Sequence, residues 1–310
     1  MSSPKFQRDL LINTIFEEAK NNKDIFFLSA DFGAPALDRF REELPSQFIH
    51  TGISEQNTID LAAGLALDGR KVFAYAMAPF ITLRCLEQHK CALSMMDLNV
   101  CTIVAGIGLG YADAGPTHYL TEDLGVLRSL IKSNISTASD SIVASKLAKD
   151  FIDNPSFNFI RLDRHACIDL KNEVTDNEIK EGYRFLKKSN SKICVISHGS
   201  LINNVIQASK NLDNEIDIID LIRIKPIHNS LSKKLSNYEK IIVVDEQSNT
   251  NGLFSAIHEF LFLNNLLKLV IPINLPEKYI YENGGREYLL KLNQLDPESL
   301  SNSINKHFKN

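Results

Sequence analysis

Three segments of the chain each place a chemically useful side chain just after a predicted strand. TGISEQN carries Glu55 at the start of a predicted helix, AMAPFITLRCLEQ carries Phe80 after a proline, and GIGLGYADAGPTHYLTEDL carries His118 in a Gly-rich loop. A carboxylate can exchange a proton with a ring nitrogen, and an aromatic face can support a flat heterocycle. An imidazole can act as an acid or base or bind a hydroxyl group. Together, the three residues would suit a site for a nitrogen heterocycle and a polar substrate.

Each of these residues also has a purely structural interpretation. Glu55 is a favourable acid near a helix dipole, Phe80 a core side chain, and His118 a surface or structural histidine. The G-x-G at 106–110 is not a dinucleotide fingerprint, because it does not open directly into a helix with the required third glycine. The chemical interpretation therefore depends on the elements that would bring the three segments together.

The elements around these segments alternate between predicted helices and short apolar strands. Helices are predicted over 8–20, over 54–67 with Ser54 as its cap, and over 81–96; strands are predicted over 25–30, 71–77, 99–106 and 158–162. Such alternation favours a doubly wound, parallel α/β sheet, whose ligand crevice lies beyond the carboxyl ends of its strands. The loops at 31–36, 51–55, 77–80 and 106–118 would then share one rim.

A second α/β unit follows a polar stretch at 163–185. It has predicted strands at 192–200, 215–221, 238–247 and 266–275, predicted helices at 201–211 and 252–264, and a helical, charged tail. We therefore predict domains over 1–168 and 185–310, joined by a linker over 169–184. No internal repeat or low-complexity stretch interrupts this plan.

The bulk properties are those of an ordinary globular protein. Its 310 residues are 44% hydrophobic and 23% charged, with a net charge of -4. No broad basic surface is implied, so nucleic acid is not an expected partner. Five cysteines without a CxxC pair indicate reduced thiols rather than a disulfide frame or a zinc site. The N-terminus has no apolar signal core and no apolar run reaches about 18 residues, so we expect a cytoplasmic protein without a membrane partner.

The order of the motifs resembles a known family. GISEQN, APFITLRCLEQ and GPTH followed by TEDL look like the pyrimidine-binding domain of transketolases and of the related 1-deoxyxylulose-5-phosphate synthases. ISHGS, DLIRIKPI and VVDEQSNTNGLFSAIHEFL resemble the transketolase C-terminal domain. The resemblance implies two doubly wound, mainly parallel α/β domains and a cofactor, thiamin diphosphate.

The resemblance also implies roles for individual residues. Glu55 matches the glutamate that contacts the cofactor's pyrimidine ring and drives the imino form of that ring. Phe80 matches the aromatic residue that stacks on the same ring. His118 matches the active-site histidine that binds substrate hydroxyls. Asp31, in SADFG, matches an aspartate near the cofactor, and Arg84 belongs to the same cofactor-binding set. Glu55 and His118 are the catalytic candidates.

Two arginines resemble residues that hold a substrate phosphate. These are Arg8 and Arg164, and a guanidinium fork suits a phosphate, although an exposed arginine without a ligand fits either position as well. Three positions depart from the transketolase pattern: Ala114 replaces an aspartate, Pro35 a serine and Gly106 a histidine. These departures imply an altered sugar specificity.

The sequence does not contain the GDG motif with which these enzymes hold the diphosphate and its divalent cation. Since the first predicted helix begins almost at residue 8, we expect another chain to supply that domain and its Mg²⁺ or Ca²⁺. The expected assembly is a self-associated pair of this chain within a heterotetramer that includes the N-terminal transketolase subunit.

The resemblance implies transfer of a two-carbon ketol unit from a ketose phosphate to an aldose-type acceptor. Three alternatives stay open. A 2-oxoacid dehydrogenase beta subunit has the same domain plan but lacks the GPTH loop. Half of a deoxyxylulose-phosphate synthase has the histidine, but a shorter spacing from Phe80 to Arg84. A non-catalytic assembly paralogue would not need Glu55, Phe80 and His118.

Overall fold

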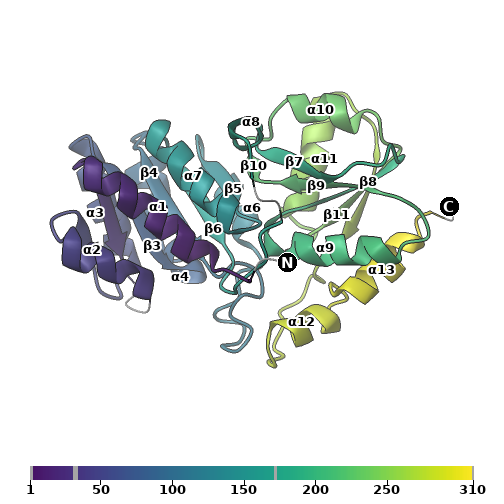
Figure 1. The fold of residues 1–310 in the computed structure, drawn as a ribbon, viewed down its shortest axis with the longest axis horizontal. Helices are drawn as coiled ribbons and strands as arrows, with labels where there is room; N and C mark the ends of the chain where they lie inside the picture. The colour runs from purple at the N-terminus through teal and green to yellow at the C-terminus, as the bar shows by residue number, and fades with distance from the viewer. Residues whose placement is uncertain (1–2, 31–33, 171–172, 309–310) are drawn as a thin grey trace.

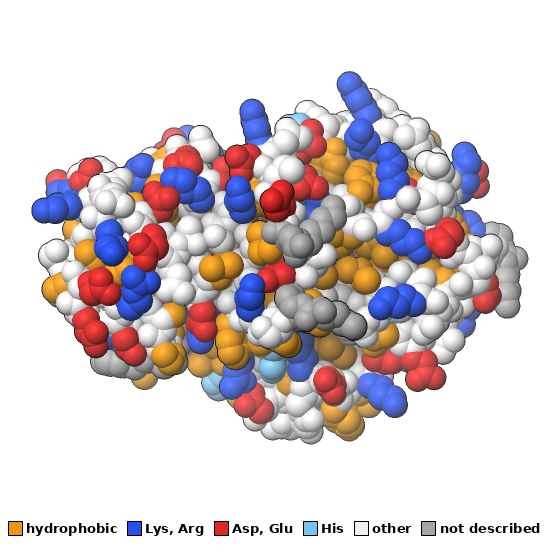
Figure 2. Space-filling model, in the orientation of Figure 1, with side chains coloured by type: hydrophobic (Ala, Val, Ile, Leu, Met, Phe, Trp, Pro, Cys, Tyr) orange, Lys and Arg blue, Asp and Glu red, His pale blue; other side chains and the backbone are white. Residues whose placement is uncertain are grey.

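The computed structural model describes residues 3–30, 34–170 and 173–308, which form two α/β units side by side. Figure 1 shows the purple-to-teal N-terminal half beside the green-to-yellow C-terminal half, each with helices over a central sheet. The predicted α/β class with two mainly parallel sheets is confirmed. Basic and acidic side chains are interspersed over the face seen in Figure 2.

The first sheet contains seven strands within the described residues, in the order β10-β5-β6-β4-β3-β1-β2. Their bounds are β1 Ile25–Ser29, β2 Phe48–His50, β3 Lys71–Met77, β4 Val100–Ala105, β5 Asn134–Thr137, β6 Asn158–Leu162 and β10 Arg223–Lys225. All neighbours are parallel except β10, which runs antiparallel to β5. The β10 strand comes from the C-terminal half, so the two halves share this sheet.

The second sheet contains five strands among the described residues, in the order β12-β11-β8-β9-β7. Their bounds are β7 Tyr183–Lys187, β8 Ile193–Ser197, β9 Asp217–Leu221, β11 Lys240–Val244 and β12 Leu269–Ile273. The β7 strand is antiparallel to β9, and the other pairs are parallel. The β8, β9 and β11 strands are mostly apolar runs buried on both faces, as expected for central parallel strands.

The helices bury apolar stripes against the two sheets. Those of the first half are α1 Gln7–Asn21, α2 Asp38–Glu43, α3 Glu55–Leu67, α4 Ala78–Thr82, α5 Leu86–Gln88, α6 Asp123–Arg128 and α7 Ser141–Asp153. Those of the second half are α8 Asp176–Glu181, α9 Ile202–Ala208, α10 Ser230–Leu235, α11 Leu253–Leu263, α12 Arg286–Leu292 and α13 Pro297–Asn305. Short 3-10 turns η1, η3 and η4 span Pro35–Leu37, Gly199–Leu201 and Ser209–Asn211. None of the described helices combines the length and apolar character that a membrane crossing requires.

Several local predictions were wrong. Ser54 is the N-cap residue of α3, but its hydroxyl donates to the Thr51 carbonyl oxygen at 2.7 Å and makes no capping hydrogen bond. The single helix predicted over 81–96 is divided into α4, α5 and the π-helix η2, His89–Ser94. In η2 the Met95 amide donates to the Lys90 carbonyl, five residues back, which widens the turn.

The polar stretch at 163–185 holds α8 and the start of β7, where an irregular linker was expected. The sequence reasoning also missed β5, β10, α6 and α7, and the strand that it expected before Glu55 without stating bounds is β2. The division at 1–168, 169–184 and 185–310 stays a prediction.

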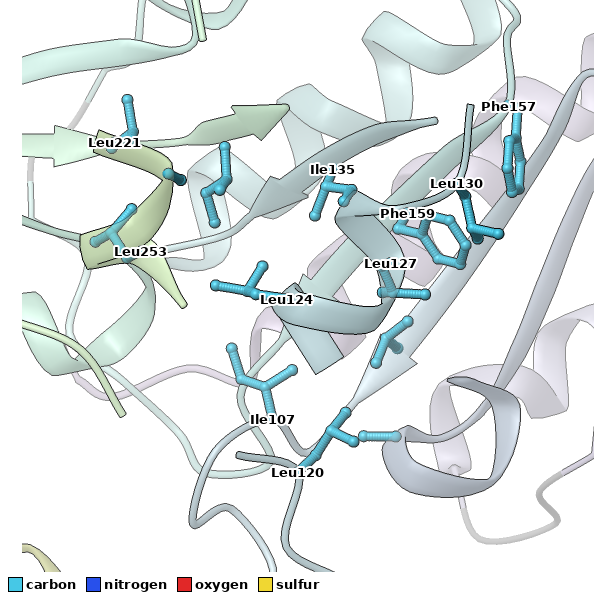
Figure 3. Close-up of a cluster of buried hydrophobic side chains, with 14 of the residues drawn as sticks. Ile107, Leu120, Leu124, Leu127, Leu130, Ile135, Phe157, Phe159, Leu221 and Leu253 are labelled. Carbon is cyan, nitrogen blue, oxygen red and sulfur yellow. The ribbon is translucent and has the colours of Figure 1, made fainter. Parts of the chain in front are cut away.

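One hydrophobic cluster crosses from one half to the other. Figure 3 shows Leu124 and Leu127 of α6 between Phe159 of the first sheet and Leu253 of α11. All four side chains are fully buried. The short α6 helix therefore helps to fix the two halves against each other, directly after the loop that carries His118.

Candidate functional site

The candidate site lies at the carboxyl end of the first sheet. The strands β2, β1, β3 and β4 are adjacent and parallel, so the segments that follow them meet at one edge. This confirms the rim predicted from the sequence. The loop after β1 includes Asp31, which lies outside the described residues.

Glu55 is the first residue of α3, and its carboxylate is buried. Only 4% of its side chain is exposed, and Arg84 Nη1 donates to its Oε2 at 2.8 Å. A buried carboxylate is costly unless it receives hydrogen bonds or a counter-charge, and Arg84 supplies both. Glu55 is thus an aligned acceptor at the rim and not a solvated acid on a helix end.

Phe80 lies in α4, directly after β3, with its ring partly exposed. The Arg84 guanidinium carbon lies 4.4 Å from the centroid of this ring, within the range of a cation–π contact. Arg84 therefore contacts Phe80 and Glu55 at once. Together, Phe80 and Glu55 hold a planar group that presents N–H donors, which is the shape and chemistry of a protonated or amino-substituted heterocycle.

His118 is next to this pair. Its ring centroid lies 5.3 Å from that of Phe80 in an edge-on arrangement, and 6.1 Å from that of Tyr111. Its Nδ1 lies 2.9 Å from the Thr117 hydroxyl, while the side chain is half-buried. The imidazole thus stands beside the partly exposed face of the site, where it can meet a polar substrate.

The loop that carries His118 is closed at its neck by backbone hydrogen bonds. The amides of Gly108 and Leu120 each donate to the other residue's carbonyl at 2.9 Å. Ile107 and Leu120 are buried in the hydrophobic cluster of Figure 3. Gly106 has a φ of +92°, and a Cβ there would lie 2.1 Å from the Tyr111 ring, so the expected histidine cannot fit without rearrangement.

Arg164 joins the same group of residues through Tyr111. Its guanidinium lies 4.5 Å from the Tyr111 ring centroid and forms an ion pair with Asp113. Hydrogen bonding from Arg164 lowers the pKa of Asp113 below its ordinary value. Sequence reasoning gave no role to Tyr111, although an aromatic residue in a Gly-rich rim loop was a signal that could have singled it out.

Arg8 has different surroundings. It lies at the start of α1, where its Nε donates to Asp9 at 2.9 Å and its guanidinium lies 5.7 Å from the Phe6 ring. Burial works to lower the Arg8 pKa, but the nearby Tyr75 and Asp9 raise it overall. The structure thus joins Glu55, Arg84, Phe80 and His118 in one chain of contacts, with Arg164 at its edge, whereas the contacts of Arg8 belong to α1 and β3.

The departures from the family pattern have plain structural settings. Pro35 begins the η1 turn, and Ala114 is exposed in the loop before His118. Within the part of the chain that the structure describes, no three His, Cys, Asp or Glu side chains are grouped to hold a metal ion.

Comparisons with known proteins match both halves. Residues 7–167 match the family described as "Transketolase, pyrimidine binding domain", and residues 182–300 match "Transketolase, C-terminal domain". The chain is 30% identical to an apulose-4-phosphate transketolase subunit of Phocaeicola vulgatus, over 90% of both chains. It is 31% identical to a 1-deoxy-D-xylulose-5-phosphate synthase of Fusobacterium nucleatum, over 94% of this chain but 49% of that one.

A solved structure described as "Split gene transketolase, inactive beta4 tetramer" has a similar fold. It superposes with a TM-score of 0.86, covering 97% of both chains at 22% sequence identity. At that identity the likeness supports the architecture and not the chemistry.

Proposed function

The chain belongs to the transketolase family, and from this premise we propose that it supplies the pyrimidine side of a thiamin-diphosphate-dependent active site. The observation that carries the proposal is the contact chain from Glu55 through Arg84 to Phe80. A buried carboxylate and an aromatic face, both already engaged with one planar N–H donor, fit the aminopyrimidine ring of that cofactor.

Each residue of the site has a defined task in this proposal. Glu55 and Phe80 would hold the ring of thiamin diphosphate, which when bound would supply the nucleophilic carbon and the electron sink that cleavage of a ketose needs. Glu55 shares a proton with a pyrimidine nitrogen, and Phe80 supports the ring face. Arg84 keeps the Glu55 carboxylate aligned. His118, beside Phe80, binds sugar hydroxyls or moves a proton to or from them.

The substrate end of the site supports a sugar phosphate. Arg164 is a guanidinium fork at the edge of the site, and its Asp113 partner is largely exposed, so a phosphate can replace that carboxylate. Arg8 stays a second candidate. We propose ketol transfer from a ketose phosphate to an aldose-type acceptor outside the pentose phosphates, since Ala114, Pro35 and Gly106 alter the pocket. The name of the 30% identical relative, an apulose-4-phosphate transketolase subunit, supports ketol transfer that involves a ketose phosphate.

The proposed partner is an N-terminal transketolase subunit that binds the diphosphate through Mg²⁺ or Ca²⁺. Two observations support it: a relative of nearly the same length is named as one subunit of a transketolase, and the similar fold comes from a split-gene transketolase. The proposed assembly is a heterotetramer containing a self-associated pair of this chain, located in the cytoplasm.

The substitution Glu55→Gln in the reconstituted complex tests the proposal. Gln keeps the shape and a hydrogen-bonding head but cannot take up the ring proton, so turnover should fall by about two to four orders of magnitude. Exchange of the cofactor's thiazolium proton should slow equally, while cofactor affinity changes much less. Normal turnover and normal thiazolium-proton exchange in an intact complex would mean that Glu55 is only a structural acid at the helix end, and would contradict the proposal.

A second candidate is a 1-deoxy-D-xylulose-5-phosphate synthase-like reaction, favoured by the 31% identity to such an enzyme. The same complex decides between them. Formation of 1-deoxy-D-xylulose 5-phosphate without ketol transfer between sugars would select this second reaction.

A further inference from the structure

The loop that carries His118 is held from outside its own domain. Loops of the C-terminal half contact it at four points. These are Glu246 Oε2 to the Leu109 amide at 3.0 Å, Gln247 Nε2 to the Leu120 carbonyl at 3.2 Å, the Glu282 carbonyl to the Tyr119 hydroxyl at 2.8 Å, and Asn283 Nδ2 to the Asp113 carbonyl at 3.2 Å. The C-terminal half thus contacts both sides of the loop neck, at Leu109 and Leu120. It also contacts the loop before and after His118, at Asp113 and Tyr119.

Glu246 packs directly against the backbone of the loop neck. Gly108, beside the Leu109 amide, has a φ of +56°, and a Cβ built on it would lie 2.4 Å from Glu246 Oε2. The backbone therefore lies directly against the carboxylate, at the point where Gly108 pairs with Leu120 through backbone hydrogen bonds. Leu120 is two residues from His118, so a shift of this neck would be passed to the imidazole over a short length of chain.

Arg286, the first residue of α12, fixes the Glu246 carboxylate. Its Nη1 donates to Glu246 Oε2 at 3.0 Å and its Nη2 donates to Oε1, a two-pronged contact that sets the carboxylate's orientation. Arg286 Nη2 also lies 3.1 Å from Asp163, directly after β6. Burial opposes these charges, but the two carboxylates together raise the Arg286 pKa above its ordinary value. One partly buried cation thus links the loop neck, the end of β6 and the C-terminal half.

We infer that Glu246 is a positioning residue, which clamps the neck of the His118 loop and sets the imidazole against Phe80. This rests on the proposed role of His118 in sugar binding. The Glu55–Arg84 pair lies on α3 and beside α4, and its contacts do not include Glu246 or Arg286. Activation of the cofactor and placement of the sugar are therefore separable in this structure. A misplacement of about 1 Å can cost about 100-fold in rate, so a loosened loop neck should be measurable.

The first arm of the test uses the full chain without cofactor. Hydrogen exchange is followed in wild type, Glu246→Ala, Glu246→Gln and the control Glu239→Ala, an exposed carboxylate in the same half. Exchange across 106–121 should accelerate in Glu246→Ala, at Leu109 most of all, and less in Glu246→Gln, whose amide oxygen can still accept the Leu109 N–H. The β3 strand should keep wild-type exchange in every variant, which verifies the fold.

The second arm uses the reconstituted complex, with His118→Ala as a comparison. In Glu246→Ala the sugar kcat/KM should fall roughly 10- to 100-fold, in the same direction as in His118→Ala, and Glu246→Gln should recover part of it. Exchange of the thiazolium proton, which depends on Glu55, should stay at the wild-type rate. A residue that only stabilises the fold would lower both quantities together.

Three results would settle the matter. Wild-type exchange across 106–121 in Glu246→Ala would overturn the clamp. A loosened loop with unchanged sugar kinetics would overturn the positioning role. A wild-type complex that transfers no ketol unit would instead refute the proposed function, and loop exchange would still decide whether Glu246 orders the loop.

Discussion

Arg84 is the residue that connects the two proposed pyrimidine contacts, and its partial exposure matters. Its side chain is 45% exposed, whereas that of Glu55 is 4% exposed. Because the guanidinium is open to solvent, it can move away from Glu55 at little cost if another donor reaches the carboxylate. A cofactor ring that offers such a donor meets this condition. A purely apolar ring would leave Glu55 buried and unpaired.

A second residue, His89, should make the fold sensitive to acid. Its ring is fully buried, Nε2 lies 2.7 Å from the Ile81 carbonyl, and the ring packs edge-on against Phe159. Burial lowers the His89 pKa to about 4, against an ordinary value near 6.5. The folded state therefore holds fewer protons than the unfolded state between these values. Its stability is full above pH 6.5 and is lost as pH falls toward 4.

The predicted size of this effect is about 3 kcal/mol over the whole window, from about 1.4 kcal/mol per pKa unit. Urea unfolding of wild type and His89→Gln at pH 7.0, 6.0 and 5.0 checks it. The variant should lose less stability on acidification than wild type, and the exposed control His228→Gln should behave as wild type. Equal pH dependence in wild type and His89→Gln would show that other groups cause the acid sensitivity.

At the scale of elements, the six-residue helix α6 contacts both halves of the molecule. Asp123 in its first turn accepts hydrogen bonds from Arg161 Nε and Nη2 at 2.6 and 2.9 Å, and from Gln247 at 2.8 Å. Its Gly125 allows close contact, since a Cβ there would lie 2.8 Å from the Asn251 Cβ. The helix thus begins on a buried ion pair and packs against both halves.

Shortening a buried side chain of α6 should therefore lower the stability of the whole protein. Leu127→Ala removes a fully buried side chain from the cluster of Figure 3, and such changes cost about 2–5 kcal/mol in the free energy of unfolding. Ile131→Ala, at an exposed position three residues after the helix, should change it by less than about 0.5 kcal/mol. Both are measured by urea unfolding at pH 7. Equal, small effects would mean that α6 does not carry the packing between the halves.

At the scale of the whole molecule, a buried cation joins the two halves. Arg184 in β7 donates to Asp140, the N-cap of α7, at 2.8 Å and to Asp220 in β9 at 2.9 Å. All three side chains are fully buried. Burial raises the Asp220 pKa, although the Arg184 charge and hydrogen bonds oppose this.

Removal of the Arg184 charge should cause a large loss of stability, and the size of that loss should depend on pH. Arg184→Met leaves two buried carboxylates with hydrogen bonds but without their cation, at a cost of about 3–5 kcal/mol near pH 7. The loss should be smaller at pH 5, because a carboxyl group that has lost its cation is more easily protonated. The double variant Arg184→Met/Asp220→Asn should recover part of the stability. Thermal unfolding at both pH values measures this, and a loss that is the same at both would argue against uncompensated carboxylates.

The sequence by itself determined which residues would stand at the rim. A strand followed by a turn places the next residue at the carboxyl edge of a parallel sheet, so Glu55, Phe80 and His118 could be assigned to one edge from local patterns alone. The strands at 71–77 and 158–162 were predicted at the bounds of β3 and β6, because continuous apolar runs specify buried strands. Short polar or mixed segments such as β10 were missed, because a strand that completes another domain's sheet has no local signal.

Only the tertiary structure decided how these residues are held. Arg84 meets Glu55 across 29 positions of sequence, and Glu246 meets Leu109 across 137. No periodicity encodes such pairs, since they depend on how helices and domains pack after the strands have formed. Likewise, nothing in VVDEQ distinguishes a solvated Glu246 from one held by Arg286. Local pattern placed the functional side chains at one edge of the sheet, and long-range packing gave them their partners and their geometry.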